Sequence, residues 1–154
     1  RIILRILSHI SCLILKKIVM LISKVSYLGE LRTSATHLGS GVSIITDAPL
    51  DNQGKGEAFS PTDLVATATA SCMLTLMGIA ARTHGLNIDG TTVEVTKVMA
   101  SNPRRIAEIR CKLVIPAGTL TGKDKQILEI AGKTCRVIQS LSTEIIKELT
   151  FEYQ

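Results

Sequence analysis

Four cysteines, at positions 12, 72, 111 and 135, are the side chains of this chain best suited to chemistry. They form no CxxC pair and no Cys/His pair with metal-ligand spacing, so we expect neither a metal site nor a cofactor. A thiol reacts as its thiolate, and a cysteine near a helix start or beside Arg136 can have a depressed pKa. Cys72 and Cys135 are therefore candidate redox thiols, although the residues alone favour two inert core cysteines.

The segment around Cys72 predicts a long helix. Ser60 is placed as the N-cap, Pro61 follows at the first helical position, and Asp63 is an acid at the third. The run from residue 64 to 84 is apolar or small on almost every side, which is typical of a buried central helix. Gly85 is a suitable residue to end it.

The rest of the chain predicts short strands and one further helix, which together indicate an α+β fold. Residues 48–60 form a predicted loop, and Cys111 falls on the inward side of an alternating strand, where we expect a buried, inert thiol. The second helix, residues 121–141, is expected to break near Gly132–Cys135. The predicted extended segments lie within residues 24–47, 91–101, 106–118 and 144–154.

The charge of the chain is concentrated at one end. The formal net charge of its 154 residues is +5, from 18 basic and 13 acidic side chains. Residues 1–24 hold five of the basic side chains and no acidic one, so residues 25–154 are formally neutral. Aromatic residues make up 3% of the chain and Trp is absent, so a nucleic-acid interface of basic and stacking side chains is not expected.

Residues 1–24 predict a separate basic and apolar extension, and residues 25–154 a single domain. Arg5, His9, Lys16 and Lys17 interrupt the apolar run, so no stretch has the length of a transmembrane helix. The extension could be non-native or a mis-assigned start, a core or dimer element, or an amphipathic targeting or membrane-surface segment. Firm membrane association is not expected.

Several motifs resemble the OsmC/Ohr family of bacterial thiol peroxidases, and more closely its OsmC-like branch. The stretch SPTDLVATATASCMLTLMG is followed about 60 residues later by TCRVIQSL. The other matching segments are Leu31–Gly41, Thr46–Leu64 and Pro103–Ile106. The resemblance implies an OsmC-like fold, with curled antiparallel sheets around long central helices in an intertwined homodimer. It also implies reduction of organic or fatty-acid hydroperoxides in oxidative stress defence.

The resemblance implies roles for particular residues. Cys72 matches the peroxidatic thiol, Cys135 the resolving thiol, and Arg32 the strand arginine that stabilises the thiolate. Family peroxidases usually carry a glutamate ten residues before the first cysteine, where this chain has Thr62, so Glu57 is the candidate to replace it. The proline that usually follows the second cysteine is replaced by Arg136.

The expected partners are a second copy of the chain, an organic or lipid hydroperoxide, and a dithiol reductant of the lipoamide or thioredoxin type. Four cysteines without a clear secretion signal favour a reducing, cytoplasmic location. An alternative function is a non-peroxidatic dimer that binds a small apolar ligand between its subunits. A protein anchored at a membrane by residues 1–24 is a third.

Overall fold

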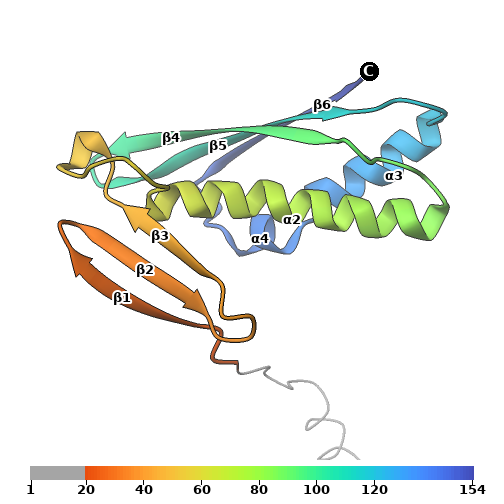
Figure 1. The fold of residues 1–154 in the computed structure, drawn as a ribbon. Coiled ribbons are helices and arrows are strands. Elements are labelled where there is room, and N and C mark those ends of the chain that lie inside the picture. The colour runs from red at the N-terminus through yellow and green to blue at the C-terminus, as the bar shows by residue number, and fades with distance from the viewer. Residues whose placement is uncertain (1–19) are drawn as a thin grey trace, which may run out of the picture. The chain divides into compact units, whose positions relative to one another are not determined.

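The structure, a computed structural model, describes residues 20–154. The predictions made for residues 1–19 lie outside the described residues. The chain divides into two compact units, one ending at Thr46 and the other spanning Asp47–Gln154, and each is described by itself. The element order matches the predicted α+β arrangement of strands and helices (Figure 1).

The first unit is a small sheet with the strand order β1-β2-β3. Its strands are β1 (Ser23–Gly29), β2 (Arg32–His37) and β3 (Ser43–Asp47). A two-residue turn joins the antiparallel strands β1 and β2, and Glu30 and Leu31 both adopt positive φ angles, of 52° and 59°. Such angles are characteristic of hairpin turns whose twist matches that of the flanking strands.

The second unit is built on the long helix α2 (Pro61–His84), preceded by a loop with a short 3-10 helix, η1 (Leu50–Asn52). The predicted start of α2 is confirmed: Asp63 N–H donates to the Ser60 hydroxyl, and Ser60 N–H donates to the Asp63 carboxylate. This reciprocal pair satisfies two backbone donors that a helix start leaves without partners. Gly85 ends the helix in the left-handed conformation, as expected.

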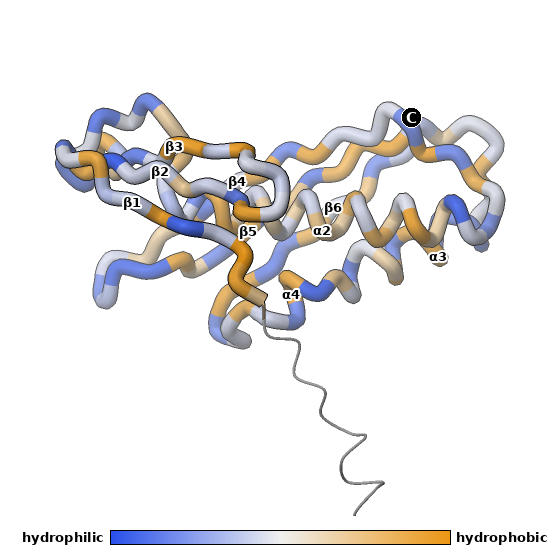
Figure 2. The backbone as a smooth tube through the Cα atoms, turned by 60° about the horizontal axis from the view of Figure 1, so that its bottom comes forward, coloured by the Kyte–Doolittle hydropathy of each residue, from blue (hydrophilic) through white to orange (hydrophobic). Residues whose placement is uncertain are grey.

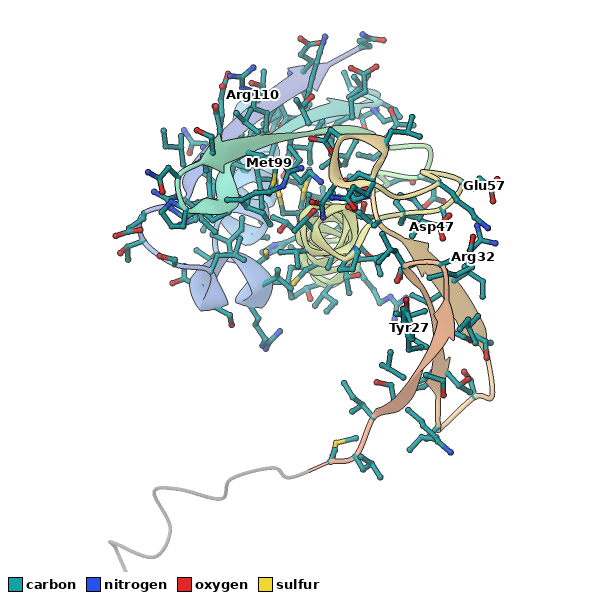
Figure 3. All side chains as sticks on the ribbon, turned by 90° about the vertical axis from the view of Figure 1, so that its left-hand side faces the viewer. Tyr27, Arg32, Asp47, Glu57, Met99 and Arg110 are labelled. Carbon is teal, nitrogen blue, oxygen red and sulfur yellow. The ribbon has the colours of Figure 1, made fainter. Side chains whose placement is uncertain are left out.

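A second three-stranded sheet, of order β4-β5-β6, lies along α2 (Figure 1). Strand β4 (Thr92–Ser101) pairs antiparallel with β5 (Arg104–Ile115), and β6 (Ile146–Tyr153) pairs parallel with β5. Alternate residues of β5 are buried, including Cys111, which confirms its predicted position in the core. On the opposite side Arg110 contacts Glu108 and Glu148 (Figure 3). Arg110 and Glu148 are open to solvent, which screens their charges, so these pairs contribute little to stability.

Two helices form the crossover that parallel pairing of β5 and β6 requires. They are α3 (Gly122–Lys133) and α4 (Arg136–Ser140), and the break between them falls where the sequence predicts it. Both helices contact α2. Gly132 permits the close approach of α3, since a Cβ atom there would lie 3.2 Å from the sulfur of Met77.

Helix α2 is buried on one face rather than on all sides. Its exposed face includes Val65, which is 37% exposed, and Ile79, which is 56% exposed, so the expectation of complete burial is wrong for a single chain. Figure 2 shows hydrophobic and neutral colours along most of the helix. The buried face consists of Ala66, Thr69, Ala70, Met73, Met77 and Ala81.

Among the described residues, α2 is also the one helix long and apolar enough to cross a membrane by length and composition. The helix packs against β4, β5, α3 and α4. This packing accounts for the apolar residues on the buried face of the helix.

The core contact of α2 can be tested with a matched pair of methionine substitutions. Met77 is fully buried and Met20 is 70% exposed. Met77→Ala is expected to lower the free energy of unfolding by about 2–5 kcal/mol, because it removes buried atoms and leaves a cavity. Met20→Ala, which removes the same atoms from an exposed position, is expected to change it by less than about 0.5 kcal/mol. Urea unfolding measures both, and equal effects would contradict this assignment of the core.

Candidate functional site: a pair of thiols

The structure brings Cys72 and Cys135 together in the second unit. Cys72 lies midway along α2 and is half-buried, whereas Cys135, in the break between α3 and α4, is fully buried. The Cys135 sulfur lies 3.9 Å from the carbonyl oxygen of Thr69, less than one helical turn before Cys72. Each thiol influences the pKa of the other, and neither is in a disulfide.

Local structure explains the position of Cys135. Helix α3 ends at Lys133, and Cys135 is the N-cap of α4, with an extended backbone. Its sulfur accepts a hydrogen bond from the backbone N–H of Ile138 at 3.4 Å. A serine or threonine oxygen usually accepts this hydrogen bond at a helix start. Here the acceptor is a sulfur, which is weaker than an oxygen.

The start of α4 also faces Cys72. Burial by itself raises the pKa of the Cys72 thiol, but hydrogen bonds from the N–H of Val137, from the Cys135 thiol and from the N–H of Arg136 lower it. The positive charge of Arg136 acts in the same direction. The net result is a pKa below the usual value of a cysteine, so more of Cys72 is thiolate at neutral pH.

The other two described cysteines behave differently. Burial raises the pKa of Cys135, and the neighbouring Cys72 adds to this effect despite the hydrogen bond from Ile138 N–H. Burial, with a smaller effect from Cys135, raises the pKa of Cys111 to about 11. The pair is therefore asymmetric, with Cys72 as the better thiolate and Cys135 as the thiol that stays protonated.

Arg32 is the first residue of β2, where it is half-buried and pairs in register with Gly29. It belongs to the first unit and the cysteines to the second. Its predicted role beside Cys72 stays a prediction. Its side chain is labelled in Figure 3.

Glu57 lies in the exposed loop between η1 and α2. Its backbone N–H donates to the carboxylate of Asp47 at 3.1 Å, which helps to fix the loop (Figure 3). The cysteine pair is held by α2 and by the break between α3 and α4. A catalytic role for the Glu57 carboxylate likewise stays a prediction.

A polar cluster at the start of α2 includes Lys97, for which the sequence motifs predict no role. Lys97 donates to the Thr62 hydroxyl at 2.7 Å and to the Asp63 carboxylate at 2.6 Å. Asp63 thus serves as a helix cap and an ion-pair partner. Burial opposes ionisation of Asp63, but the Lys97 and Ser60 hydrogen bonds hold the pKa of its carboxyl below the usual range.

The signal for Lys97 was present in the alternation of β4. Val93, Val95 and Lys97 share one side of the strand, and Lys97 pairs with the buried Ile109. A lysine in an inward register must find a buried partner. The cluster lies about 15 Å from Cys72 along the axis of α2, at roughly 1.5 Å per residue, so it belongs to the helix start rather than to the thiol pair.

No group of three His, Cys, Asp or Glu side chains within residues 20–154 is arranged to hold a metal ion. The chemistry available at the pair is that of two neighbouring thiols of different pKa. One can act as a nucleophile, and two neighbouring thiols can together be oxidised to a disulfide.

Comparison with known proteins identifies the class to which this fold and thiol pair belong. A sequence model of the family described as OsmC-like protein matches residues 54–149. The chain belongs to the OsmC/Ohr family, as its motifs predict. No match was found among curated proteins.

Solved structures agree with this assignment. A protein from Psychrobacter arcticus 273-4, named for osmotic stress induction and a detoxification response, is 51% identical, with a TM-score of 0.83. The match covers 90% of this chain and 100% of that chain. An OsmC-like protein from Mycoplasma pneumoniae is 16% identical, with a TM-score of 0.74, over 90% of this chain and 99% of that one.

An organic hydroperoxide resistance protein from Elizabethkingia anophelis has the same fold. It is 14% identical, with a TM-score of 0.70, over 91% of this chain and 100% of that one. At this identity the likeness concerns the fold alone. The predicted OsmC-like α+β fold is confirmed, with the correction that β5 and β6 pair in parallel, where antiparallel sheets were expected.

The asymmetry of the thiols predicts an order of alkylation. At pH 7 iodoacetamide is expected to label Cys72 first, since its pKa is lowered and it is partly exposed, whereas Cys135 is buried with a raised pKa. Cys111 serves as an internal control that should react only after unfolding. Peptide mass spectrometry over a time course measures the order, and faster labelling of Cys135 would contradict the assignment.

Proposed function

We propose that this protein is a thiol-dependent reductase of organic hydroperoxides, with Cys72 as the peroxidatic and Cys135 as the resolving thiol. The observation that carries the proposal is the proximity and asymmetry of the two thiols: the Cys135 sulfur lies 3.9 Å from the Thr69 carbonyl oxygen on α2, the pKa of Cys72 is lowered and that of Cys135 is raised. Family membership supports it, as does the stress and detoxification name of the Psychrobacter relative.

In the first step the Cys72 thiolate attacks the distal oxygen of the hydroperoxide. A sulfur–oxygen bond forms, the oxygen–oxygen bond breaks, and the alkoxide leaves and takes up a proton to become an alcohol. Cys72 is then a sulfenic acid, oxidised by two electrons. The N–H groups of Arg136 and Val137 stabilise the thiolate before attack.

In the second step the Cys135 sulfur attacks the sulfenic acid. A disulfide forms, the sulfur–oxygen bond breaks, and water leaves with the proton of Cys135. An external dithiol then returns two electrons and two protons and becomes a disulfide itself. We place lipoamide- or thioredoxin-type dithiols in this role, and the cytoplasm as the compartment that keeps both thiols reduced.

Arg32 and Glu57 complete the proposed site. A guanidinium is suited to bind the peroxide oxygens because it offers several donors in one plane. Glu57 would orient that guanidinium, replacing the glutamate of related peroxidases, whose position is occupied by Thr62. Thr62 accepts a hydrogen bond from Lys97.

We also propose that the active form is a homodimer in which α2 meets its counterpart. The exposed face of α2 supports this, because Val65 and Ile79 are apolar and Ala68 and Ser71 are small. Small side chains let helix backbones approach closely, and an apolar face of a core helix is normally covered.

The dimer is tested by placing a charge on that face. Ile79→Glu is expected to shift the protein toward a monomer in light-scattering chromatography, because an unpaired carboxylate would be buried between the helices. The control is Ile130→Glu on α3, where the side chain is 63% exposed and the same change should leave the mass unaltered. An unchanged mass for Ile79→Glu would exclude this interface.

Peroxide consumption tests the catalytic proposal. With tert-butyl or linoleic hydroperoxide and dihydrolipoamide, Cys72→Ser is expected to reduce turnover to the uncatalysed rate, because a serine hydroxyl is not ionised at neutral pH. Cys135→Ser should consume one equivalent and stop at the sulfenic acid.

The control for this assay is Cys111→Ser, which changes a third thiol outside the pair, checked for folding by circular dichroism. It is expected to retain turnover. Equal peroxide decay in wild type and Cys72→Ser would refute the enzyme and favour a dimer that only binds an apolar ligand.

A further inference from the structure

We propose that Tyr27 is a positioning residue for Arg32. Its hydroxyl holds the turn between β1 and β2 in a strained conformation, which fixes the backbone from which the Arg32 side chain extends. The inference deepens the proposed function and rests on it for its catalytic meaning, because Arg32 is there the residue that binds the peroxide oxygens. The motifs that carry the family resemblance do not include Tyr27.

The turn that leads into Arg32 is strained. Glu30 and Leu31 have φ angles of 52° and 59°, in the left-handed region that residues with a Cβ atom rarely adopt. A two-residue turn of this kind normally carries Asn-Gly or Asp-Gly, because those residues tolerate a positive φ. Leu31 is 45% exposed and Glu30 is exposed as well, so burial of their side chains does not account for the conformation.

The Tyr27 side chain holds this turn from β1. The backbone N–H of Leu31 donates to the hydroxyl oxygen of Tyr27 at 3.2 Å, four residues back along the chain. A hydrogen bond is directional, so this contact fixes the orientation of the peptide at Leu31. Arg32 is the next residue, and it belongs to the same sheet as Tyr27 (Figure 3). The contact therefore constrains the backbone immediately before the arginine.

The pairing of β1 and β2 is also irregular at this point. Tyr27 pairs with Thr33 and Gly29 pairs with Arg32, so Leu28 is an extra residue on β1. A bulge of this kind bends its strand and changes the direction of side chains, often beside a functional site. The bulge, the strained turn and the tyrosine contact thus converge on the backbone of one half-buried arginine. Strain persists where the surrounding structure enforces a particular geometry, and such places cluster at active sites.

The test removes the tyrosine hydroxyl alone. In the full chain, Tyr27→Phe is expected to accelerate hydrogen exchange of the Leu31 amide about threefold, a modest factor because the lost hydrogen bond is exposed and water competes for it. The rate at which tert-butyl hydroperoxide oxidises Cys72 in a single turnover should fall about fivefold, because Arg32 is no longer held in one geometry. NMR measures the exchange, and peptide mass spectrometry of quenched samples measures the oxidation.

A double-mutant cycle determines whether Tyr27 acts through Arg32. Arg32→Gln removes the guanidinium and should itself slow oxidation, and adding Tyr27→Phe should then slow it no further. A tyrosine that only stabilised the sheet would slow oxidation equally in both backgrounds. Tyr27→Phe combined with Leu31→Gly should return the rate to within about twofold of wild type, because glycine adopts a positive φ without the help of the hydroxyl.

The matched control is Tyr153→Phe, which removes the hydroxyl of the second of the two tyrosines in the chain. That hydroxyl donates to the backbone carbonyl of Lys125 at 3.3 Å and links β6 to α3. Exchange of the Leu31 amide and oxidation of Cys72 should both remain at the wild-type level in this variant. Circular dichroism checks that every variant is folded.

Amide exchange distinguishes this inference from the proposed function because it needs no peroxide. If wild type fails to react with hydroperoxides but Tyr27→Phe still accelerates Leu31 exchange selectively, the function is refuted and the hold of Tyr27 on the turn before Arg32 stands. Unchanged exchange of the Leu31 amide refutes the inference. If wild type is active, an unchanged oxidation rate in Tyr27→Phe refutes it as well, and so does equal slowing with and without the Arg32 guanidinium.

Discussion

The packing of one face of α2 against β4, β5, α3 and α4 is the constraint on which the second unit depends. That face combines alanines with Met73 and Met77, which are fully buried, so neighbouring elements approach the helix closely. Burial of each large side chain contributes about 1.5–3 kcal/mol, before the entropy cost of ordering is counted. The same contacts fix the sulfur of Cys72 relative to the end of α3, because Gly132 packs on Met77.

The thiol pair is a consequence of how α3 ends. If α3 and α4 were one continuous helix, Cys135 would lie in the helix interior, and its sulfur would not cap the start of a helix. The break instead turns the backbone of Cys135 to an extended conformation, and α4, whose first N–H groups have no acceptor within the helix, begins beside α2. Partial positive charge at these groups opposes the desolvation that would otherwise keep Cys72 protonated.

Much of this arrangement could be predicted from the sequence because it rests on local signals. Ser60, Asp63 and Gly85 define the ends of α2 through capping chemistry, and alternation in β5 places Cys111 in the core. The family motifs identified Cys72 and Cys135 as partners. The inward Lys97 has a local signal as well, but its partners Thr62 and Asp63 are distant in sequence.

Other properties depend on contacts that no local pattern encodes. The one-sided burial of α2 could not be predicted, since a helix that is apolar on all sides gives the same pattern whether its own chain or a second copy covers it. The direction of each pKa shift could not be predicted from the sequence either. Proximity in sequence links Arg136 to Cys135, yet its charge and N–H act favourably on Cys72, across from α4.

The asymmetry of the pair also bears on how a disulfide between these cysteines would be reduced. A thiol of lower pKa is the better leaving group, so chemistry favours attack of a dithiol on the Cys135 sulfur with departure of Cys72. The accessibility of the sulfurs favours attack on Cys72 instead, because Cys135 is fully buried and Cys72 is partly exposed. Attack on Cys72 would expel the poorer leaving group. Attack on Cys135 requires α4, a helix of five residues held at its start by a weak sulfur cap, to move away from α2. Because so short a helix has few contacts to lose, movement of α4 is the less costly way to combine access with the better leaving group.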